Sequence, residues 1–318
     1  MPEVITIGES MVLMVADTGE PLEAVTSFSR YIAGAESNVA IGLARLGHQA
    51  GWISVIGDDP FGTYLRNTIR GEGVDTSQVV VMPQYPTGLM IKERTDVGDP
   101  QVFYYRKGSA ASHLSADLLK KEYFDGVKIL HLTGIFPALS AITKDTLFTA
   151  IKIAKQHGLM ISFDPNIRFK LWEADEAKET LLKIAELSDL ILPGVKEAEF
   201  LLGTQEWEEI SQYFHEKGNR CVVMKNGPDG AFYSVREERG ITKGYEKGFR
   251  VPKVVDTVGA GDGFAVGVLS GILEGLPIQE AVKRGNAIGS LAVAVRGDCD
   301  GYPDKRKLEK YLLDANKG

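Results

Sequence analysis

Residues that bind metals or form disulfides are scarce in this 318-residue sequence. Its two cysteines, Cys221 and Cys299, are too few for a disulfide framework. The five histidines form no cluster with the spacing of zinc ligands: His48, His113, His131, His157 and His215. These absences argue against a disulfide-stabilised scaffold and against a zinc site.

Long stretches of one kind of residue are also absent. No basic run is long, and the net charge is −7 from 36 basic and 43 acidic residues, which argues against nucleic acid as a partner. No apolar run approaches the length of a membrane span, and the N-terminus lacks a charged segment followed by an apolar one. We therefore expect a cytoplasmic protein without a membrane partner. Its 44% hydrophobic content allows a sizeable core, in two average domains or one large α/β domain.

Known phosphate-binding loops are missing too. The chain contains no Gly-Lys pair, which excludes the loop of the P-loop enzymes. Residues 259–264 (GAGDGF) lack the third glycine of the dinucleotide fingerprint and lie near the C-terminus, far from a first βα turn. A dinucleotide-dependent oxidoreductase is therefore disfavoured.

What is present is a glycine-rich turn at residues 256–264 (DTVGAGDGF). The apolar residues 251–255 predict a strand before it, and a helical pattern begins near Phe264. Glycines at a strand-to-helix turn let the backbone approach an anion, and the first N–H groups of the helix then point at that anion. We predict a phosphate cradle built from Gly259, Ala260 and Gly261.

Asp262 lies inside this predicted cradle. A carboxylate beside a bound phosphate suits phosphoryl transfer, where an aspartate accepts the proton of the attacking hydroxyl. The alternative is structural, because an aspartate can also cap the N-terminus of a helix.

The second half of the chain alternates strand and helix patterns. Strands are expected at 129–132, 159–163, 190–192 and 221–224, and helices at 140–156 and 176–187. This alternation predicts a parallel sheet with helices on both faces, and ligands of such sheets bind beyond the carboxyl ends of the strands. Those ends carry small polar residues, Gly or Pro: residues 133–134, 164–166, 193–194, 225–227 and 256–257.

The first third differs. Residues 11–16, 28–33, 87–93 and 101–106 resemble strands, and no helical pattern separates the members of each pair. We expect them to form a small antiparallel sheet apart from the α/β core. Alternation along 102–106 would place Tyr104 and Arg106 on one face, where an arginine can grip a carboxylate with two hydrogen bonds. The alternative is an exposed edge strand with a solvated Arg106.

The chain resembles the ribokinase-like carbohydrate kinases of the phosphofructokinase-B group. Residues 256–262 resemble their C-terminal signature. Residues 34–40 (GAESNVA), 43–47 and 55–62 resemble the N-terminal one. The resemblance covers Gly8 to about Asn286. It implies one domain over 1–318, with a three-layer α/β/α core, a mostly parallel sheet and a small β-sheet lid formed by about 11–33 and 86–106. A lid excludes water from the phosphoryl group, and in this family it is often a dimer contact, so a homodimer or higher homo-oligomer through the lid is implied.

The resemblance also implies site residues. The sugar would contact Gly34, Asn38, Tyr104, Arg106, Arg168, Asp262 and Asp298. ATP would lie along Lys225, Gly227, Asp229 and Gly230, with Gly259 and Gly261 at its phosphates and Asn286 near its adenine. Magnesium would be organised by Glu197 through water, since Gly194 stands where relatives carry an asparagine. A monovalent cation is a further cofactor of such enzymes.

Within the family, the combination of Tyr104-Tyr105-Arg106, Arg168 and residues 131–135 with 138–140 resembles the 2-keto-3-deoxygluconate kinases. Fructokinases share residues 164–166 with the nearby arginine, so Tyr104-Tyr105-Arg106 is the more discriminating part. Met90 departs from that subgroup, which commonly has a tyrosine there. The hypothesis is an ATP-dependent kinase that makes the 6-phosphate of this sugar acid, with Asp262 as general base and the 259–262 backbone as anion hole. The alternatives are a fructokinase or ribokinase of a neutral sugar, and a non-catalytic sugar-binding sensor.

Overall fold

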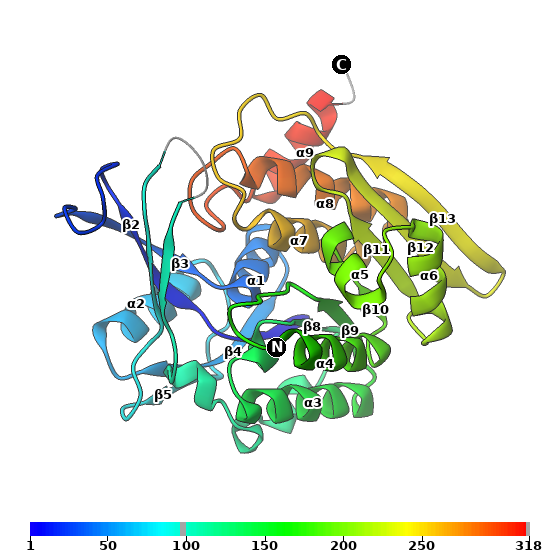
Figure 1. The fold of residues 1–318 in the computed structure, drawn as a ribbon. Helices are drawn as coiled ribbons and strands as arrows, with labels where there is room; N and C mark the ends of the chain where they lie inside the picture. Colours follow the sequence, from blue (N-terminus) through cyan, green and yellow to red (C-terminus); the bar gives the residue numbers. More distant parts are fainter. Residues whose placement is uncertain (96–99, 316–318) are drawn as a thin grey trace.

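The computed structural model describes residues 1–95 and 100–315 as strands and helices arranged in layers (Figure 1). The strands are β1 (Val4–Ile7), β2 (Met11–Ala16), β3 (Phe28–Ala33), β4 (Ala50–Gly57), β5 (Val79–Met82), β6 (Leu89–Lys92), β7 (Val102–Tyr105), β8 (Ile129–Thr133), β9 (Met160–Asp164), β10 (Leu190–Ile191), β11 (Cys221–Lys225), β12 (Gly230–Glu237) and β13 (Gly240–Lys247). The helices are α1 (Ala35–Arg45), α2 (Pro60–Gly71), α3 (Ala141–Gln156), α4 (Ala174–Glu186), α5 (Val195–Leu202), α6 (Trp207–Glu216), α7 (Ala260–Leu273), α8 (Ile278–Ala292) and α9 (Lys305–Ala315).

Nine strands form the large sheet, in the order β13-β12-β11-β10-β9-β8-β1-β4-β5. The pairs from β11 to β5 are parallel, and the β12–β13 hairpin adds two antiparallel strands at one edge. Strand order reverses on either side of β1 and β8, which is where ligands of open α/β sheets bind. The predicted ribokinase-like fold with a mostly parallel sheet is confirmed.

The two faces of the sheet bury alternate residues of each strand. Val4 contributes to the apolar cluster under α1, α2, α7, α8 and α9, whereas Ile5 contributes to the cluster under α3, α4, α5 and α6. Figure 1 shows α3 and α4 on one side of the sheet and α1, α7 and α8 on the other. The buried strands therefore form the middle layer of three.

The small sheet has the order β3-β2-β6-β7 and stands beside the core (Figure 1). Its β2–β3 and β6–β7 pairs are antiparallel, as expected, but β2 and β6 are parallel to each other. Four buried residues form its own apolar cluster: Met11, Leu13, Ala33 and Met90. The four strands lie within the expected segments 11–33 and 86–106, of which residues 96–99 lie outside the described part of the chain, as do 316–318.

Most elements expected in the second half are present within one or two residues. The helix expected at 140–156 is α3, which begins after a capping box in which Ser140 and Thr143 bond each other's backbone amides. The strand expected at 251–255 is wrong, because this segment is irregular and lies outside the sheet. Its contact is with the end of α8, where the amide of Val255 donates to the carbonyl of Val293 at 2.7 Å.

The beginning of α7 near Phe264 is also wrong, since the helix begins at Ala260. The glycines inside α7 allow neighbouring residues to pack closely against the helix. A Cβ at Gly263 would lie 2.9 Å from Tyr302, one at Gly267 2.4 Å from the backbone of Gly285, and one at Gly271 2.5 Å from Ala281. Glycine normally weakens a helix interior, but here it brings α8 against α7.

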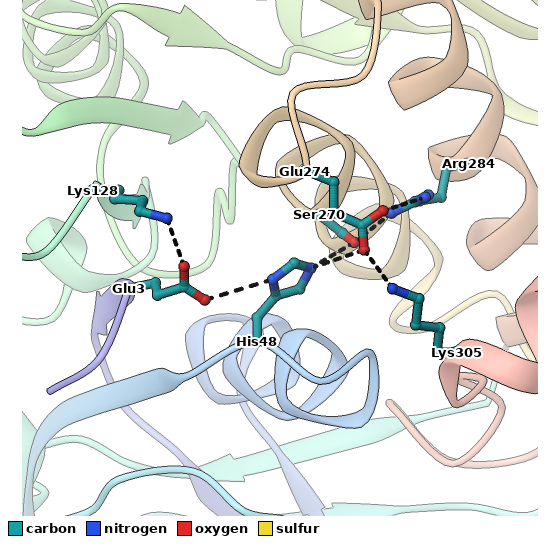
Figure 2. Close-up of polar contacts among 7 residues, drawn as sticks. All are labelled: Glu3, His48, Lys128, Ser270, Glu274, Arg284 and Lys305. Carbon is teal, nitrogen blue, oxygen red and sulfur yellow. Dashed lines mark hydrogen bonds and ion pairs between the residues drawn. The ribbon is translucent and has the colours of Figure 1, made fainter.

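The far end of α7 is held by a polar network (Figure 2). His48 Nε2 lies 2.8 Å from Ser270 Oγ, and Glu274 accepts hydrogen bonds from Arg284 at 2.9 Å and Lys305 at 3.2 Å. Burial lowers the pKa of His48, so the ring is neutral near pH 7 and its contact with Ser270 is an uncharged hydrogen bond. The network joins α7 to α8, α9 and the end of α1. Within residues 1–95 and 100–315, no helix has both the length and the apolarity needed to cross a membrane.

Candidate active site

The N-terminus of α7 opens toward the carboxyl ends of the strands. Gly259 is its N-cap, with φ +76°, and a Cβ there would lie 1.7 Å from the carbonyl oxygen of Asp298. Both the left-handed backbone and the close approach require glycine at this position. No side chain of the described residues caps the helix. The first-turn amides of Gly261 and Asp262 therefore lack helical partners, as an anion site requires.

Asp262 lies in the first turn of α7 and does not cap it. Its carboxylate accepts hydrogen bonds from Asn38 Nδ2 at 2.8 Å and from Asn166 Nδ2 at 3.2 Å. Burial raises the pKa of Asp262, while Asn38 and the charges of Arg168 and Lys225 act in the opposite direction. A buried carboxylate held by two amides has the fixed position and raised basicity that suit a general base.

An asparagine at the start of a helix can also serve only as its N-cap, but Asn38 does not cap α1. Gly34, not Asn38, is the N-cap of α1, and Asn38 lies within the helix with its side chain on Asp262. A Cβ at Gly34 would lie 2.5 Å from the carbonyl oxygen of Glu9, so glycine lets the β1–β2 connection pass against the start of α1. The two separated signature segments therefore meet at Asp262.

Lys225 ends β11 beside the cradle. Its Nζ lies 2.6 Å from Asp164 Oδ2, and a Cβ at Gly261 would lie 3.8 Å from the same Nζ. Burial opposes the charge of Lys225, but Asp164 and Glu197 outweigh this effect and raise the pKa of the ammonium group. A lysine that stays charged next to the first-turn amides adds positive potential where a phosphate would lie.

Tyr104 and Arg106 have different surroundings. Tyr104 lies on β7 opposite Met90 and is 44% exposed, with Lys170 Nζ 5.8 Å from the centre of its ring. Arg106 lies one residue beyond β7, and its Nε donates to Glu9 Oε2 at 2.7 Å while its Nη2 contacts the same oxygen. Glu9 also accepts from Ser109 Oγ. The solvated alternative for Arg106 is wrong, since its side chain is 10% exposed and already holds a buried carboxylate.

The connection after β9 places Arg168 near Asp262. Asn166 has φ +38°, the one positive φ outside glycine among the described residues. Such a conformation is tolerated by asparagine and is often found at functional sites. Asn166 donates to Asp262, a role that sequence analysis missed although the segment 164–166 was predicted at the rim of the sheet. Arg168 is exposed, and its charge lowers the pKa of Asp262.

The expected nucleotide residues converge on the end of β13. Residues 227–229 form a 3-10 turn after β11, and Gly230 then opens β12 with φ +127°. A Cβ at Gly230 would lie 2.0 Å from the carbonyl oxygen of Glu246. Asn286 on α8 donates to that same carbonyl at 3.0 Å, so its side-chain amide has a structural partner here. The backbone oxygen of Asp229 accepts from the Tyr245 hydroxyl.

Glu197 uses both carboxylate oxygens on backbone amides. Oε2 accepts from the amide of Gly194 at 2.7 Å, and Oε1 accepts from the amide of Ile167 at 3.0 Å. Among the described residues there is no group of three or more His, Cys, Asp or Glu side chains that could hold a metal ion. Since both oxygens of Glu197 already accept from backbone amides, a metal ion bound directly to Glu197 would have to share them.

Two further buried acids lie near Asp262. Asp298 is 6% exposed, and burial together with Asp262 raises its pKa to about 7. Glu36, on α1, is fully buried, and burial raises its pKa to about 7 as well. Thr133 Oγ1 donates to its Oε1 at 2.6 Å, while its Oε2 has no partner among the described residues. Sequence analysis missed Glu36, whose position in the GAESNVA motif was the available signal.

Comparisons with known proteins match nearly the whole chain. Residues 1–305 match the model of the pfkB family carbohydrate kinases. The chain is 47% identical over 313 residues, covering 98% of it, to the 2-dehydro-3-deoxygluconokinase of Bacillus subtilis (strain 168), of which 95% is covered. It is 33% identical over 99% of its length to a candidate chloroplastic fructokinase, fructokinase-6, of Arabidopsis thaliana, of which 83% is covered. A candidate ribokinase II of E. coli, solved with ATP and Mg²⁺, superimposes with a TM-score of 0.91 at 28% identity, over 99% of this chain and all of that one.

Proposed function

Since the chain belongs to the pfkB family of carbohydrate kinases, we propose that it transfers the γ-phosphoryl group of ATP to the 6-hydroxyl of 2-keto-3-deoxygluconate, which is the same sugar acid as 2-dehydro-3-deoxygluconate. The observation that carries the choice of sugar is the 47% identity, along nearly the whole chain, to a 2-dehydro-3-deoxygluconokinase. Arg168 supports an acidic substrate, because it is exposed and its charge acts on Asp262. Arg106 lies beside β7 but pairs with Glu9, so it would bind a sugar carboxylate only in addition to that partner.

Asp262 is the general base in this proposal. Its carboxylate takes the proton of the sugar hydroxyl as that oxygen attacks the phosphorus atom. Asn38 and Asn166 hold both of its oxygens, so the carboxylate is oriented before substrate arrives. General-base assistance of this kind contributes about 10²–10⁴ in rate.

The backbone of residues 259–262 is the anion hole. Its amides, and the ammonium of Lys225 close to Gly261, face the negative charge that grows on the transferred phosphoryl group. One preorganised donor in such a site is worth roughly 3 kcal/mol. Gly259 is required because a side chain there would collide with the Asp298 carbonyl.

ATP and Mg²⁺ are the proposed cofactors. The helix N-terminus and Lys225 fit the phosphates, and residues 227–230 with Asn286 border the nucleotide side. When bound, the metal neutralises phosphate charge. The amide-bonded Glu197 would orient water of the metal and would not bind the metal itself. No observation favours a monovalent cation, and it stays a prediction from the family resemblance.

A neutral-sugar kinase is the second candidate, favoured by the 33% identity to a candidate fructokinase. Alanine variants of Arg106 and Arg168 distinguish the candidates, because a neutral sugar offers no carboxylate to these side chains. A non-catalytic sensor is disfavoured by the intact Asp262 and cradle.

The test is a coupled ADP-release assay with 2-keto-3-deoxygluconate, fructose, ribose and adenosine, and NMR of the product to locate the new phosphate ester. We expect kcat/KM for the sugar acid to exceed that for each other substrate by at least 100-fold, with the phosphate on O6. Asp262→Asn, purified in parallel, measures any contaminating kinase. Comparable kcat/KM for fructose or ribose would contradict the proposed substrate.

A further inference from the structure

A lysine of the small sheet contacts the segment before the phosphate cradle. Lys92, at the end of β6, places its Nζ 2.6 Å from Asp256 Oδ2. Lysine side chains are seldom buried unless they are paired. Lys92 is 8% exposed, while Phe103 and Tyr105 on the neighbouring β7 are exposed. This lysine is therefore directed into the molecule, and its ion pair is largely removed from water.

Asp256 holds the turn that leads into α7. Its Oδ1 accepts from the amide of Val258 at 3.2 Å, and its own amide donates to the carbonyl of Val293 at 3.3 Å. Residues 248–259 form no strand or helix of their own. The path of the chain into Gly259 thus depends on a few side-chain and backbone hydrogen bonds, and the partner of Lys92 makes two of them.

The charges around Lys92 explain why a cation is needed at this point. Burial raises the pKa of Asp298, the charges of Asp262 and Asp256 raise it further, and the charge of Lys92 acts in the opposite direction. Three carboxylates next to a cradle for phosphate would repel the ligand. An ammonium fixed among them reduces this repulsion, and breaking such a desolvated pair is costly because it leaves a buried charge without its partner.

We propose that Lys92 is a positioning residue that couples the small sheet to the phosphate cradle through Asp256, so that sugar held under the sheet tightens the binding of ATP. The ligands named here rest on the proposed function. When sugar orders the small sheet, Lys92 holds Asp256 and the turn at Val258, and the amides of the cradle adopt their binding arrangement. Because coupling between two sites is reciprocal, ATP then tightens sugar binding by the same factor.

The coupling is measured by calorimetry of a non-hydrolysable ATP analogue, with and without saturating 2-keto-3-deoxygluconate. In the parent we expect the sugar to lower Kd at least fivefold, the lower end of typical couplings. Lys92→Met should reduce this factor to less than twofold, and Lys92→Arg should restore it. The control is Lys144→Met, which removes the 2.8 Å ion pair between Lys144 on α3 and Glu176 on α4 and should keep the parent factor.

Asp256→Asn and the double variant Lys92→Met/Asp256→Asn complete a mutant cycle. If the residues act as a pair, the double variant loses no more coupling than either single variant. The double variant also avoids a lone buried carboxylate, so it remains informative if Lys92→Met folds poorly. A parent without coupling, full coupling in Lys92→Met, or additive losses in the cycle would each overturn the proposal.

Amide exchange in the ligand-free protein separates this proposal from the choice of sugar. We expect faster exchange at Val258 in Lys92→Met than in the parent or in Lys144→Met, whatever the substrate is. If 2-keto-3-deoxygluconate fails to bind, the proposed function is wrong, and the calorimetry is repeated with the sugar that the substrate panel identifies. Unchanged exchange at Val258 would overturn the link between Lys92 and the cradle.

Discussion

Replacing Asp262 by asparagine removes the charge and basicity of the carboxylate and keeps its shape. In the parent, Oδ2 and Oδ1 accept from Asn38 and Asn166. An asparagine at 262 would place its NH₂ group against the NH₂ group of Asn38 or of Asn166, and two donors cannot bond each other. Asn38 can respond by turning its own amide, since its Oδ1 has no hydrogen-bond partner among the described residues. We therefore expect Asp262→Asn to fold without rearrangement of the site.

Two opposing effects set the stability of this variant. Hydrogen bonds to a charged acceptor are worth about 1.5–3 kcal/mol each, against about 1 kcal/mol for neutral ones, so some bonding energy is lost. Burial disfavours the charge, as the raised pKa of Asp262 shows, so removing the charge relieves a desolvation cost. These effects are of similar size, and we expect the free energy of unfolding to change by less than about 1 kcal/mol.

Activity should respond very differently. Loss of the base predicts a fall in kcat of about 10²–10⁴, with the Kd values of ATP and sugar within a few-fold of the parent. The parent needs an unprotonated Asp262, so its kcat should rise with pH through a pKa above the ordinary range of aspartates, while the residual rate of the variant should lack that limb. Asp175→Asn, at an exposed position of α4, is the matched control. A kcat within tenfold of the parent, with intact fold and binding, would remove Asp262 from the role of base.

Three further predictions follow from the site and the small sheet. Arg168→Ala should raise KM for the sugar acid about ten- to a hundredfold through a lost charged hydrogen bond, and far less for any neutral sugar accepted; Arg106→Ala should in addition lower Tm, because Glu9 loses its buried partner. Equal effects on acid and neutral sugars would exclude carboxylate recognition. Glu36→Gln should stabilise the protein above pH 7 by about 3 kcal/mol, because burial raises the pKa of Glu36 to about 7 and its ionisation between about pH 4.5 and 7 costs stability in the parent. The gain should vanish near pH 4.5 in denaturant titrations, and a gain independent of pH would contradict this reasoning. The small sheet, with four buried apolar residues of its own, should form a dimer contact, so light scattering should give twice the chain mass at micromolar concentration; a monomer would contradict it.

The regular parts of the fold were predictable because their signals are local. The alternation of strand and helix patterns indicated β8, β9, β10 and α3, and the Ser140 capping box marks the beginning of α3 within one residue. The strand predicted at 251–255 is wrong because that prediction, too, used only a local signal. A β-branched run favours a strand locally, but strand formation also needs a pairing partner, and here the amides of Val255 and Asp256 bond the carbonyl of Val293 at the end of α8.

The contacts of the site were less predictable because they join distant residues. Asn38 and Asp262 are 224 positions apart, and Lys92 and Asp256 are 164 apart. Residue type and motif indicated that Asn38, Asp262 and Arg106 matter. That Arg106 holds Glu9, or that Lys92 meets Asp256, depends on how the small sheet is oriented on the core, which no local pattern reports.

The layer formed by α3 and α4 offers a position for selective chemical labelling of the protein. α3 runs antiparallel to its strands, so its last turns lie at the end of the sheet opposite the site, and Lys152 is exposed there. Both native thiols are poorly reactive, because Cys299 is buried, Cys221 is only partly accessible, and burial raises the pKa of each thiol. A single cysteine introduced at Lys152 would therefore take a fluorophore or a surface tether selectively, and would anchor the protein with its site facing away from the support.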